Sequence, residues 1–291
     1  MRIPLLLLAL SAALFSSAQS ASAAAFGSSI MNASNVRLQF FNGTTWIDAT
    51  STQATLAGSI LSSQSTATLG VTTVSSGLVS GLNAPQSFVS PTLPSIAEPT
   101  TVPLTGLGAS ATDSFARGDT LGFGTSIIGG SLATSTLAEV NALGSVTGNA
   151  NGNVGGTSLF TVNVNQAGQY RLAFTGNLAM QSTADGFANN SFRVQINQSQ
   201  GATSVSIDYA DPLLNRSISG TSSANVNTNF FSPVVTLTAG PIATFSITQV
   251  SEVGVTAIPE PSSIAIFSLM SAGSIVAWRR RRNKEDSASK A

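Results

Sequence analysis

Two pairs of aspartates are the best candidates for catalysis or metal binding in this chain. Asp113 and Asp119 form the first pair, and Asp208 and Asp211 form the second. Paired carboxylates act as acid and base in glycoside hydrolysis, and carboxylate oxygens bind calcium. Neither pair has the Asp-x-Asp-x-Asp-Gly spacing of a calcium-binding loop, and Asp211 precedes a proline, as turn residues often do. The pattern favours surface and turn roles, with catalysis or metal binding as the alternative.

Histidine and cysteine are both absent from the sequence. Histidine is the commonest general base and transition-metal ligand at neutral pH, and cysteine supplies disulfides and thiolate metal sites. Residues 26–258 also contain no lysine that could activate a serine nucleophile. These absences exclude most hydrolase designs, so we predict a protein that is not an enzyme, with no catalytic residue, no metal site and no cofactor.

Aromatic side chains can stack on the apolar face of a sugar, as they do in lectin-like sandwiches. Tyr170 and Tyr209 lie on the buried phase of alternating segments, so we expect both in the core. Trp46 follows Gly43-Thr44-Thr45 and is the remaining candidate for a sugar platform. Packing is the favoured role for Trp46 too, with sugar binding as the alternative.

The body of the chain is mildly acidic and carries few charges. Only 8% of all residues are charged, against a typical value of about 25%. Residues 26–258 contain five arginines and nine carboxylates. Because a protein that neutralises phosphates needs clustered lysine and arginine, this composition argues against nucleic acid as a partner.

The N-terminus has the three parts of a secretory signal peptide. Arg2 precedes an apolar run over residues 3–15, and Ala21 and Ala23 form a small-residue cleavage site. The run is too short for a stable membrane span. We predict a signal peptide over residues 1–23, with cleavage after residue 23 or 25. An uncleaved anchor or a buried helix is the alternative.

The C-terminus has a Pro-Glu-Pro element, an apolar run and a basic cluster, in that order. The element consists of Pro259, Glu260 and Pro261. The uncharged run over residues 262–278 has seventeen residues, the lower limit of the roughly 17 to 25 that cross a bilayer as a helix. Four arginines stop the run: Arg279, Arg280, Arg281 and Arg282. By the positive-inside rule they keep the tail, residues 283–291, in the cytoplasm and leave the body outside.

Residues 258–282 resemble the PEP-CTERM sorting signal of exported proteins in Gram-negative bacteria. The resemblance implies that a membrane-embedded cysteine peptidase, an exosortase, recognises the tail and cuts near the Pro-Glu-Pro element. It also implies a link with exopolysaccharide and biofilm matrix. The tail after the arginines is somewhat longer than the family pattern. A plain single-pass anchor is the alternative.

Alternation of apolar and polar residues predicts strands with one buried face. Residues 160–164 and 170–174 alternate on either side of Gly168 and are expected to form a β-hairpin. Further strands are predicted at residues 36–40, 192–196, 205–209, 234–237 and 242–250. Many short strands separated by turn residues predict an all-β body over residues 26–257, an antiparallel β-sandwich with a jelly roll as the chief variant. The N-terminal strand is expected to pair with the C-terminal strands.

The region around residues 44–105 gives a weaker signal. Residues 44–80 are rich in Ser and Thr and fit exposed strands, a low-complexity stalk or a glycosylated segment. Residues 84–105 contain five prolines and predict an extended loop or linker.

Two short patterns predict local structure within the body. Thr136 and Glu139 have the spacing of a capping box, so we expect a short helix that Gly144 ends. Gly152, Gly155 and Gly156 lie in an Asn/Gly-rich stretch without the spacing of a phosphate-binding loop, which predicts a flexible turn.

The whole sequence predicts an exported cell-surface or extracellular-matrix protein with a structural or adhesive role. The expected partners are a sorting peptidase, the membrane before processing, and exopolysaccharide. A carbohydrate-binding module, which needs an exposed aromatic platform or a calcium site, is the first alternative. A carbohydrate-active enzyme, which needs two carboxylates that face one cleft at about 5 to 10 Å, is the second.

Overall fold

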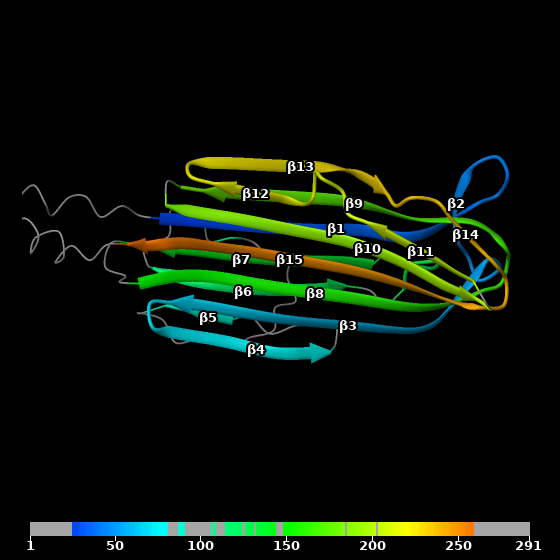
Figure 1. Ribbon diagram of the computed structural model, residues 1–291, viewed down its shortest axis with the longest axis horizontal. Helices are drawn as coiled ribbons and strands as arrows, with labels where there is room; N and C mark the ends of the chain where they lie inside the picture. Colours follow the sequence, from blue (N-terminus) through cyan, green and yellow to red (C-terminus); the bar gives the residue numbers. More distant parts are fainter. Residues whose placement is uncertain are drawn as a thin grey trace, which may run out of the picture.

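The structure is a computed structural model that describes residues 25–80, 87–90, 106, 108, 114–123, 126–130, 132–143, 148–183, 185–201 and 203–258. Fifteen β-strands and no helix lie in these residues. The strands form two antiparallel sheets that face each other (Figure 1). The predicted all-β fold with antiparallel sheets is therefore confirmed.

The two sheets differ in strand order. Sheet A has eight strands in the order β13-β9-β1-β7-β6-β5, with β14 beside β9 and β2 beside β1. Its strands are β1 (Ala25–Phe41), β2 (Trp46–Asp48), β5 (Ser87–Val89), β6 (Phe115–Phe123), β7 (Leu132–Ala142), β9 (Gly168–Ser182), β13 (Ser222–Phe231) and β14 (Val235–Leu237). Sheet B has seven strands in the order β11-β10-β15-β8-β3-β4, with β12 beside β10. Its strands are β3 (Ala54–Leu69), β4 (Thr72–Ser80), β8 (Gly148–Val164), β10 (Gly186–Gln200), β11 (Thr203–Tyr209), β12 (Arg216–Ser219) and β15 (Ile242–Ile258).

The core lies between the sheets and is built from alternate residues of each strand. On β8, Phe160, Val162 and Val164 are at most 2% exposed. On β9, Tyr170 and Leu172 are fully buried. The strands predicted at residues 192–196, 205–209 and 242–250 lie within β10, β11 and β15. Alternation thus predicted both these strands and the faces that they bury.

β8 and β9 follow each other closely in the chain but lie in different sheets, so the predicted hairpin is wrong. β8 pairs with β3 and β15, whereas β9 pairs with β1 and β13. The hydroxyl of Tyr170 lies 2.6 Å from the carbonyl oxygen of Gln166 and 3.0 Å from that of Gln53, which fixes the crossing between the sheets. A tyrosine bonded to backbone a few residues upstream makes the same kind of corner in immunoglobulin sandwiches. Alternation indicates the buried face of a strand but not its neighbour.

The predicted helix at Thr136 and Glu139 is also wrong, because both residues lie in β7 between β1 and β6. Thr136 points into the sandwich, where its hydroxyl lies 2.9 Å from that of Ser251. Glu139 points to the other side of sheet A and accepts a hydrogen bond from the amide of Gly108 at 2.7 Å. Pairing with a strand on each side outweighs a capping signal that is purely local.

The glycine-rich stretch forms part of β8, so the turn predicted there is wrong too. Gly152 lies against the backbone of Arg117 in the facing sheet. Glycine in a strand often marks a site where another backbone comes close. Gly152 thus allows close packing of the two sheets and is not part of a flexible turn.

Residues 44–80 form β2, β3 and β4, which agrees with the exposed-strand interpretation of the Ser/Thr-rich segment. A buried hydroxyl contact also joins β3 to β5 of sheet A, because the hydroxyl of Ser65 lies 2.7 Å from that of Ser87. The same hydroxyl lies 2.7 Å from that of Ser76 on the neighbouring strand β4. In the proline-rich segment, residues 87–89 form β5; apart from Ser90, the rest of residues 84–105 lies outside the described part.

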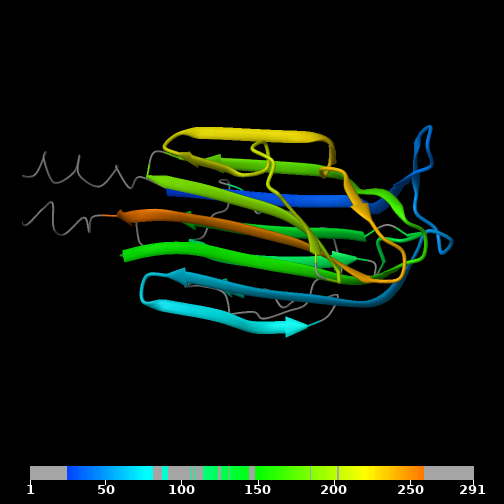
Figure 2. The same ribbon diagram turned by 45° about the vertical axis from the view of Figure 1, so that its right-hand side comes forward.

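The two ends of the described body lie together. β1 begins and β15 ends at the same end of the sandwich, on the left of Figures 1 and 2, which we call the terminal pole. There, Gly27 of β1 lies against Val253 of β15, so that a Cβ added to Gly27 would be 3.4 Å from the Cβ of Val253. β2 and β14 lie at the opposite end, the β2 pole. The N-terminal strand β1 was expected to pair with strands from the C-terminal part of the body, and it does pair with β9. The last strand, β15, lies in the other sheet.

Candidate functional site

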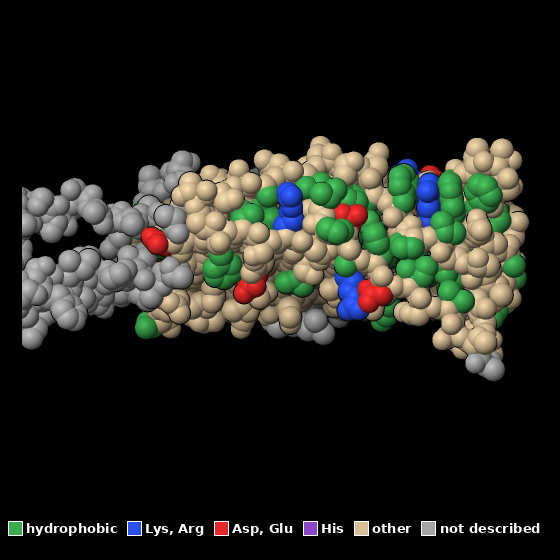
Figure 3. Space-filling model, turned by 45° about the horizontal axis from the view of Figure 1, so that its top comes forward, with side chains coloured by type: hydrophobic (Ala, Val, Ile, Leu, Met, Phe, Trp, Pro, Cys, Tyr) green, Lys and Arg blue, Asp and Glu red, His purple; other side chains and the backbone are tan. Residues whose placement is uncertain are grey.

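Aromatic and arginine side chains gather on the outer face of sheet A at the β2 pole. Figure 3 shows hydrophobic side chains collecting toward this end of a surface that is otherwise mostly uncharged and polar. The group, here called the Arg171 cluster, consists of Arg171, Trp46, Phe231, Phe41 and Gln39. Its members come from β1, β2, β9 and β13, which the sheet places side by side.

A tight connection between β1 and β2 positions Trp46. The side-chain oxygen of Asn42 accepts hydrogen bonds from the amides of Thr44 (2.9 Å) and Thr45 (2.8 Å), and Gly43 has a φ of 94°. Asparagine and glycine suit such a turn because one bonds to nearby amides and the other adopts positive φ without strain. The turn places Trp46 opposite Phe41, with ring centroids 5.4 Å apart.

The guanidinium of Arg171 lies between two aromatic rings. Its central carbon is 4.2 Å from the ring centroid of Trp46 and 4.0 Å from that of Phe231. Both distances are within the range of cation–π attraction, about 6 Å. Its Nε donates a hydrogen bond to Oε1 of Gln39 at 3.0 Å. Partial burial lowers the pKa of Arg171, although a guanidinium stays charged throughout the physiological range.

The cluster has a positive charge that no carboxylate in the described part of the chain pairs with. Asp48 accepts from Nε2 of Gln39 at 3.1 Å and forms an ion pair with Arg37 at 2.9 Å. Arg171 has no ion-pair partner among the described residues, and its terminal nitrogens form no hydrogen bond there. A guanidinium fork with free terminal nitrogens is suited to bind a carboxylate or phosphate with two parallel hydrogen bonds.

The three aromatic candidates have different environments. Tyr170 is fully buried in the core, as expected. Tyr209 packs against the core but is only half-buried, so its predicted core position is met in part, and its hydroxyl donates to Oδ2 of Asp211 at 2.6 Å. Trp46 is half-buried and packs on Phe41 and Arg171, so it combines a packing role with a place at the surface.

The second aspartate pair does not form a joint site. Asp208 is exposed and pairs with Arg193, whose hydrogen bonds lower the pKa of this carboxyl. Asp211 lies in the turn after β11, where its carboxylate accepts from the amide of Leu213 at 2.8 Å. The two carboxylates therefore have separate partners, in an ion pair and in a turn.

The first aspartate pair is only partly described, because Asp113 lies outside the described residues. The surface or turn role predicted for this pair is wrong for Asp119, which is fully buried within β6 and forms an ion pair with Arg117 two residues before it. Burial raises the pKa of Asp119 to about 6, against the lowering effect of Arg117, and the charge of Glu139 raises it further. Sequence reasoning missed this buried group of Arg117, Asp119 and Glu139, although the i, i+2 spacing of the first two placed them on one face of a strand.

Glu139 also lines a cleft of about 290 Å³ on the outer face of sheet A. Phe26, Ser28 and Gln181 lie along the same cleft. Glu139 is the one carboxylate among the described residues that line it. Glycoside hydrolysis of the usual kind needs two such groups, so this part of the chain does not provide the arrangement.

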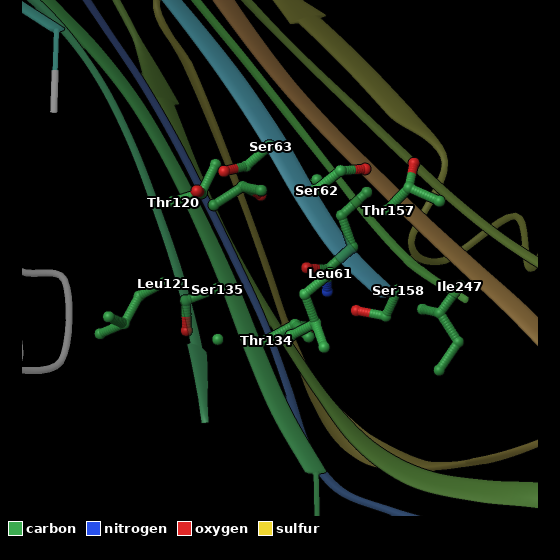
Figure 4. A pocket seen from close by; sticks show the side chains of 14 residues that line it. Leu61, Ser62, Ser63, Thr120, Leu121, Thr134, Ser135, Thr157, Ser158 and Ile247 are labelled. Carbon is green, nitrogen blue, oxygen red and sulfur yellow. The ribbon is translucent and has the colours of Figure 1, made fainter. Parts of the chain in front are cut away.

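A second, smaller cavity lies between the sheets (Figure 4). Its volume is about 30 Å³, enough for about two water molecules but not for a sugar. Side chains from both sheets surround it, among them Thr134 of β7 and Ser158 of β8. Three buried polar atoms on its wall have no hydrogen-bond partner in the described structure: Oγ of Ser63, Oγ1 of Thr134 and Nε2 of Gln249.

Comparison of the chain with protein-family models, with curated proteins and with solved structures gives no match. Function must therefore be inferred from the side chains themselves. No group of three or more metal-ligating residues occurs in the described part of the chain. The same residues contain no helix long and apolar enough to cross a membrane.

The terminal signals lie outside the described residues. They comprise the cleavage site at Ala21 and Ala23, the element Pro259, Glu260 and Pro261, the run at 262–278 and the arginines Arg279 to Arg282. All of them stay predictions from the sequence.

Sequence reasoning did not find Arg171 and Phe231, which complete the cluster around Trp46. Residues 46, 171 and 231 are far apart in the chain, and no local spacing connects them. The pairing of β9 with β1 and β13 brings them together.

Proposed function

We propose that this protein is exported and displayed at the surface or in the extracellular matrix of a Gram-negative bacterium, with a structural or adhesive role and no enzymatic activity. The single observation that carries the proposal is the position of the two poles. β1 begins and β15 ends at the terminal pole, while the Arg171 cluster lies at the β2 pole. A body tethered through its C-terminus presents this cluster away from the membrane.

The tail supplies the sorting step of the proposal. A signal peptide over residues 1–23 directs export, and a transmembrane helix over residues 262–278 with Arg279–Arg282 behind it holds the protein in the membrane. An exosortase-type peptidase then cuts near Pro259-Glu260-Pro261. Proline on both sides of Glu260 disfavours helix and keeps the backbone extended, as a protease cleft requires.

Exopolysaccharide is the proposed partner of the displayed body. The family resemblance suggests this link, and the surface chemistry supports it. The body has no lysine and is rich in hydroxyl and amide side chains, which exchange hydrogen bonds readily with sugar hydroxyls. The half-exposed ring of Trp46 lies beside a guanidinium whose terminal nitrogens have no partner among the described residues, which also favours the alternative of a carbohydrate-binding module at the cell surface.

Cysteine labelling of intact cells tests the proposed display, since the natural chain has no cysteine. Thr44 is exposed at the β2 pole, whereas Ala67 is fully buried in β3. The variant Thr44→Cys should react with a membrane-impermeant maleimide on intact cells, and Ala67→Cys should react only after denaturation. Labelling of Thr44→Cys only after lysis would show that the body stays inside the cell.

A further inference from the structure

The Arg171 cluster is arranged as a receptor for one planar anion. The central carbon of the guanidinium lies over the rings of Trp46 and Phe231, at 4.2 and 4.0 Å from their centroids. Nε is held by Gln39, which leaves the terminal nitrogens as donors without a partner among the described residues. A ligand that approaches in the plane of the guanidinium meets these donors side by side, which is the geometry of bidentate carboxylate binding.

The arginine is also held in place before any ligand binds. Gln39 accepts from Arg171 and donates to Asp48, and Asp48 in turn pairs with Arg37. With two aromatic rings packed against the guanidinium and its Nε bonded, little side-chain freedom is left to lose on binding. Such preorganisation lowers the entropic cost of binding a ligand.

The charge of the cluster selects a ligand with few negative charges. Arg37 and Asp48 neutralise each other, so among the described residues Arg171 contributes a single positive charge without an ion-pair partner. Phosphate- or sulfate-rich polymers bind where several cations cluster, and residues 26–258 contain no lysine. One carboxylate per binding unit matches this charge.

The surroundings of the arginine favour a carboxylate that is attached to a ring. Phe231 is 46% exposed, so much of its ring is available beside the guanidinium. An aromatic surface next to a charged fork suits a sugar whose C–H face is apolar and whose substituent is a carboxylate. Trp46 also packs against the guanidinium and extends the apolar border.

From these contacts we propose that Arg171, with Phe231 and Trp46, binds the uronic acid residues of an acidic polysaccharide. This inference deepens the proposed adhesive function and rests on it for the encounter between protein and polysaccharide. The two can fail separately, because cell-surface display is tested by labelling and by the mass of the mature chain, neither of which involves a sugar.

Titration calorimetry with the exported, purified protein tests the proposal, with polygalacturonate as the probe. Fully methyl-esterified polygalacturonate has the same sugar ring without the charge. We expect saturable binding of the acid and at least about tenfold weaker binding of the ester, because the ester lacks the charge-assisted bonds. The variant Arg171→Gln should lose about tenfold in affinity, and Phe231→Ala should weaken binding as well.

Arg216→Gln is the matched control, because Arg216 is exposed on β12 in sheet B and has no ion pair among the described residues. It removes the same charge and should leave the affinity within about twofold, since general electrostatic attraction is screened by salt. Arg171→Lys keeps the charge but lacks the planar fork, so it should bind more weakly than the wild type. If circular dichroism shows that Arg171→Gln is unfolded, the affinities of Arg171→Lys and Phe231→Ala are compared with that of the wild type instead.

Four outcomes would overturn the proposal. These are the absence of saturable binding to polygalacturonate, equal binding of acid and ester, unchanged affinity in the folded Arg171 and Phe231 variants, and equal or tighter binding to poly-glutamate or dextran sulfate. The last result would identify an acidic peptide or a general polyanion as the ligand instead.

Discussion

Gly152 of β8 lies directly against the backbone of Arg117 in β6, so that a Cβ on Gly152 would lie 2.3 Å from the carbonyl oxygen of Arg117. Real Cβ atoms do not approach an oxygen this closely, and the atom in the way belongs to a backbone held in a sheet. We therefore expect Gly152→Ala to force the two sheets apart and to lower the free energy of unfolding by about 2 kcal/mol or more. Urea unfolding of the purified variant measures this loss.

Gly156 provides the control in the same strand. A Cβ there would meet its nearest atom, the carbonyl oxygen of Ser62, at 4.0 Å, which is ordinary contact. Gly156→Ala should change stability by less than about 1 kcal/mol, with a small gain possible because alanine restricts the unfolded chain. Equal losses in both variants would contradict the close approach of the sheets at Gly152.

Thr134 and Thr136 form a second matched pair, two residues apart on the inner face of β7. Oγ1 of Thr134 is buried without a hydrogen-bond partner in the described structure, whereas that of Thr136 bonds to Ser251 at 2.9 Å. Thr136→Val should cost about 1 to 3 kcal/mol, because it leaves Ser251 with one partner fewer. Thr134→Val should cost little or stabilise the protein. Thermal unfolding of both variants measures the two changes in stability. A larger loss of stability in Thr134→Val would contradict the hydrogen bonding described for the two threonines.

Asp119 gives the stability of the protein a distinctive pH dependence. Burial raises its pKa from 3.8 to about 6, so between these values the folded protein binds more protons than the unfolded chain. The free energy of unfolding contributed by this group therefore falls as pH rises from about 4 to 6, by about 3 kcal/mol in total. The variant Asp119→Asn should lose this part of the slope in urea unfolding measured from pH 4 to 7.

Asp208 is the control for that experiment. Hydrogen bonds from Arg193 lower its pKa, so its titration falls below the window in which Asp119 responds. Asp208→Asn should therefore keep the wild-type slope between pH 4 and 7. If Asp119→Asn keeps the wild-type slope as well, Asp119 is not the group that titrates there.

Tyr170 and Tyr209 both form a hydroxyl hydrogen bond, but in different surroundings. The hydroxyl of Tyr170 bonds to backbone oxygens at the crossing between the sheets, while that of half-buried Tyr209 bonds to a turn aspartate. Tyr170→Phe should cost about 1 to 2 kcal/mol, since it leaves backbone acceptors without this partner in the turn. Tyr209→Phe should cost less than Tyr170→Phe in the same urea titration. The reverse order would contradict a corner role for Tyr170.

The buried face of each strand could be predicted from the sequence, but its partner could not. The alternation at Phe160, Val162 and Val164 depends on local chain geometry, which repeats every two residues. Which strand lies beside β8 depends instead on contacts with β3 and β15, about a hundred residues away on either side. The predicted hairpin failed for this reason, and so did the helix at Thr136.

The Arg171 cluster shows the same limit for a binding site. Trp46 could be selected from the sequence because it follows Gly43-Thr44-Thr45 and is not on the buried phase of an alternating segment, as the two tyrosines are. Its partners Arg171 and Phe231 lie on other strands, and only the strand pairing brings their side chains to the ring of Trp46. The proximity of the buried carboxylates Asp119 and Glu139 could not be predicted for the same reason. Only the pairing of β7 with β6 brings Glu139 close to Asp119.

The mass of the mature protein tests the central claim of sorted export most directly. The protein is recovered from membranes and medium of cells with and without the sorting peptidase, and its two ends are determined by mass spectrometry. We predict that wild-type cells yield a chain that starts at residue 24 or 26 and ends near Pro259-Glu260-Pro261. Cells without the peptidase should yield a chain that keeps residues 262–291. Recovery of residues 262–291 in full from wild-type cells would contradict sorting by cleavage and leave a plain membrane anchor.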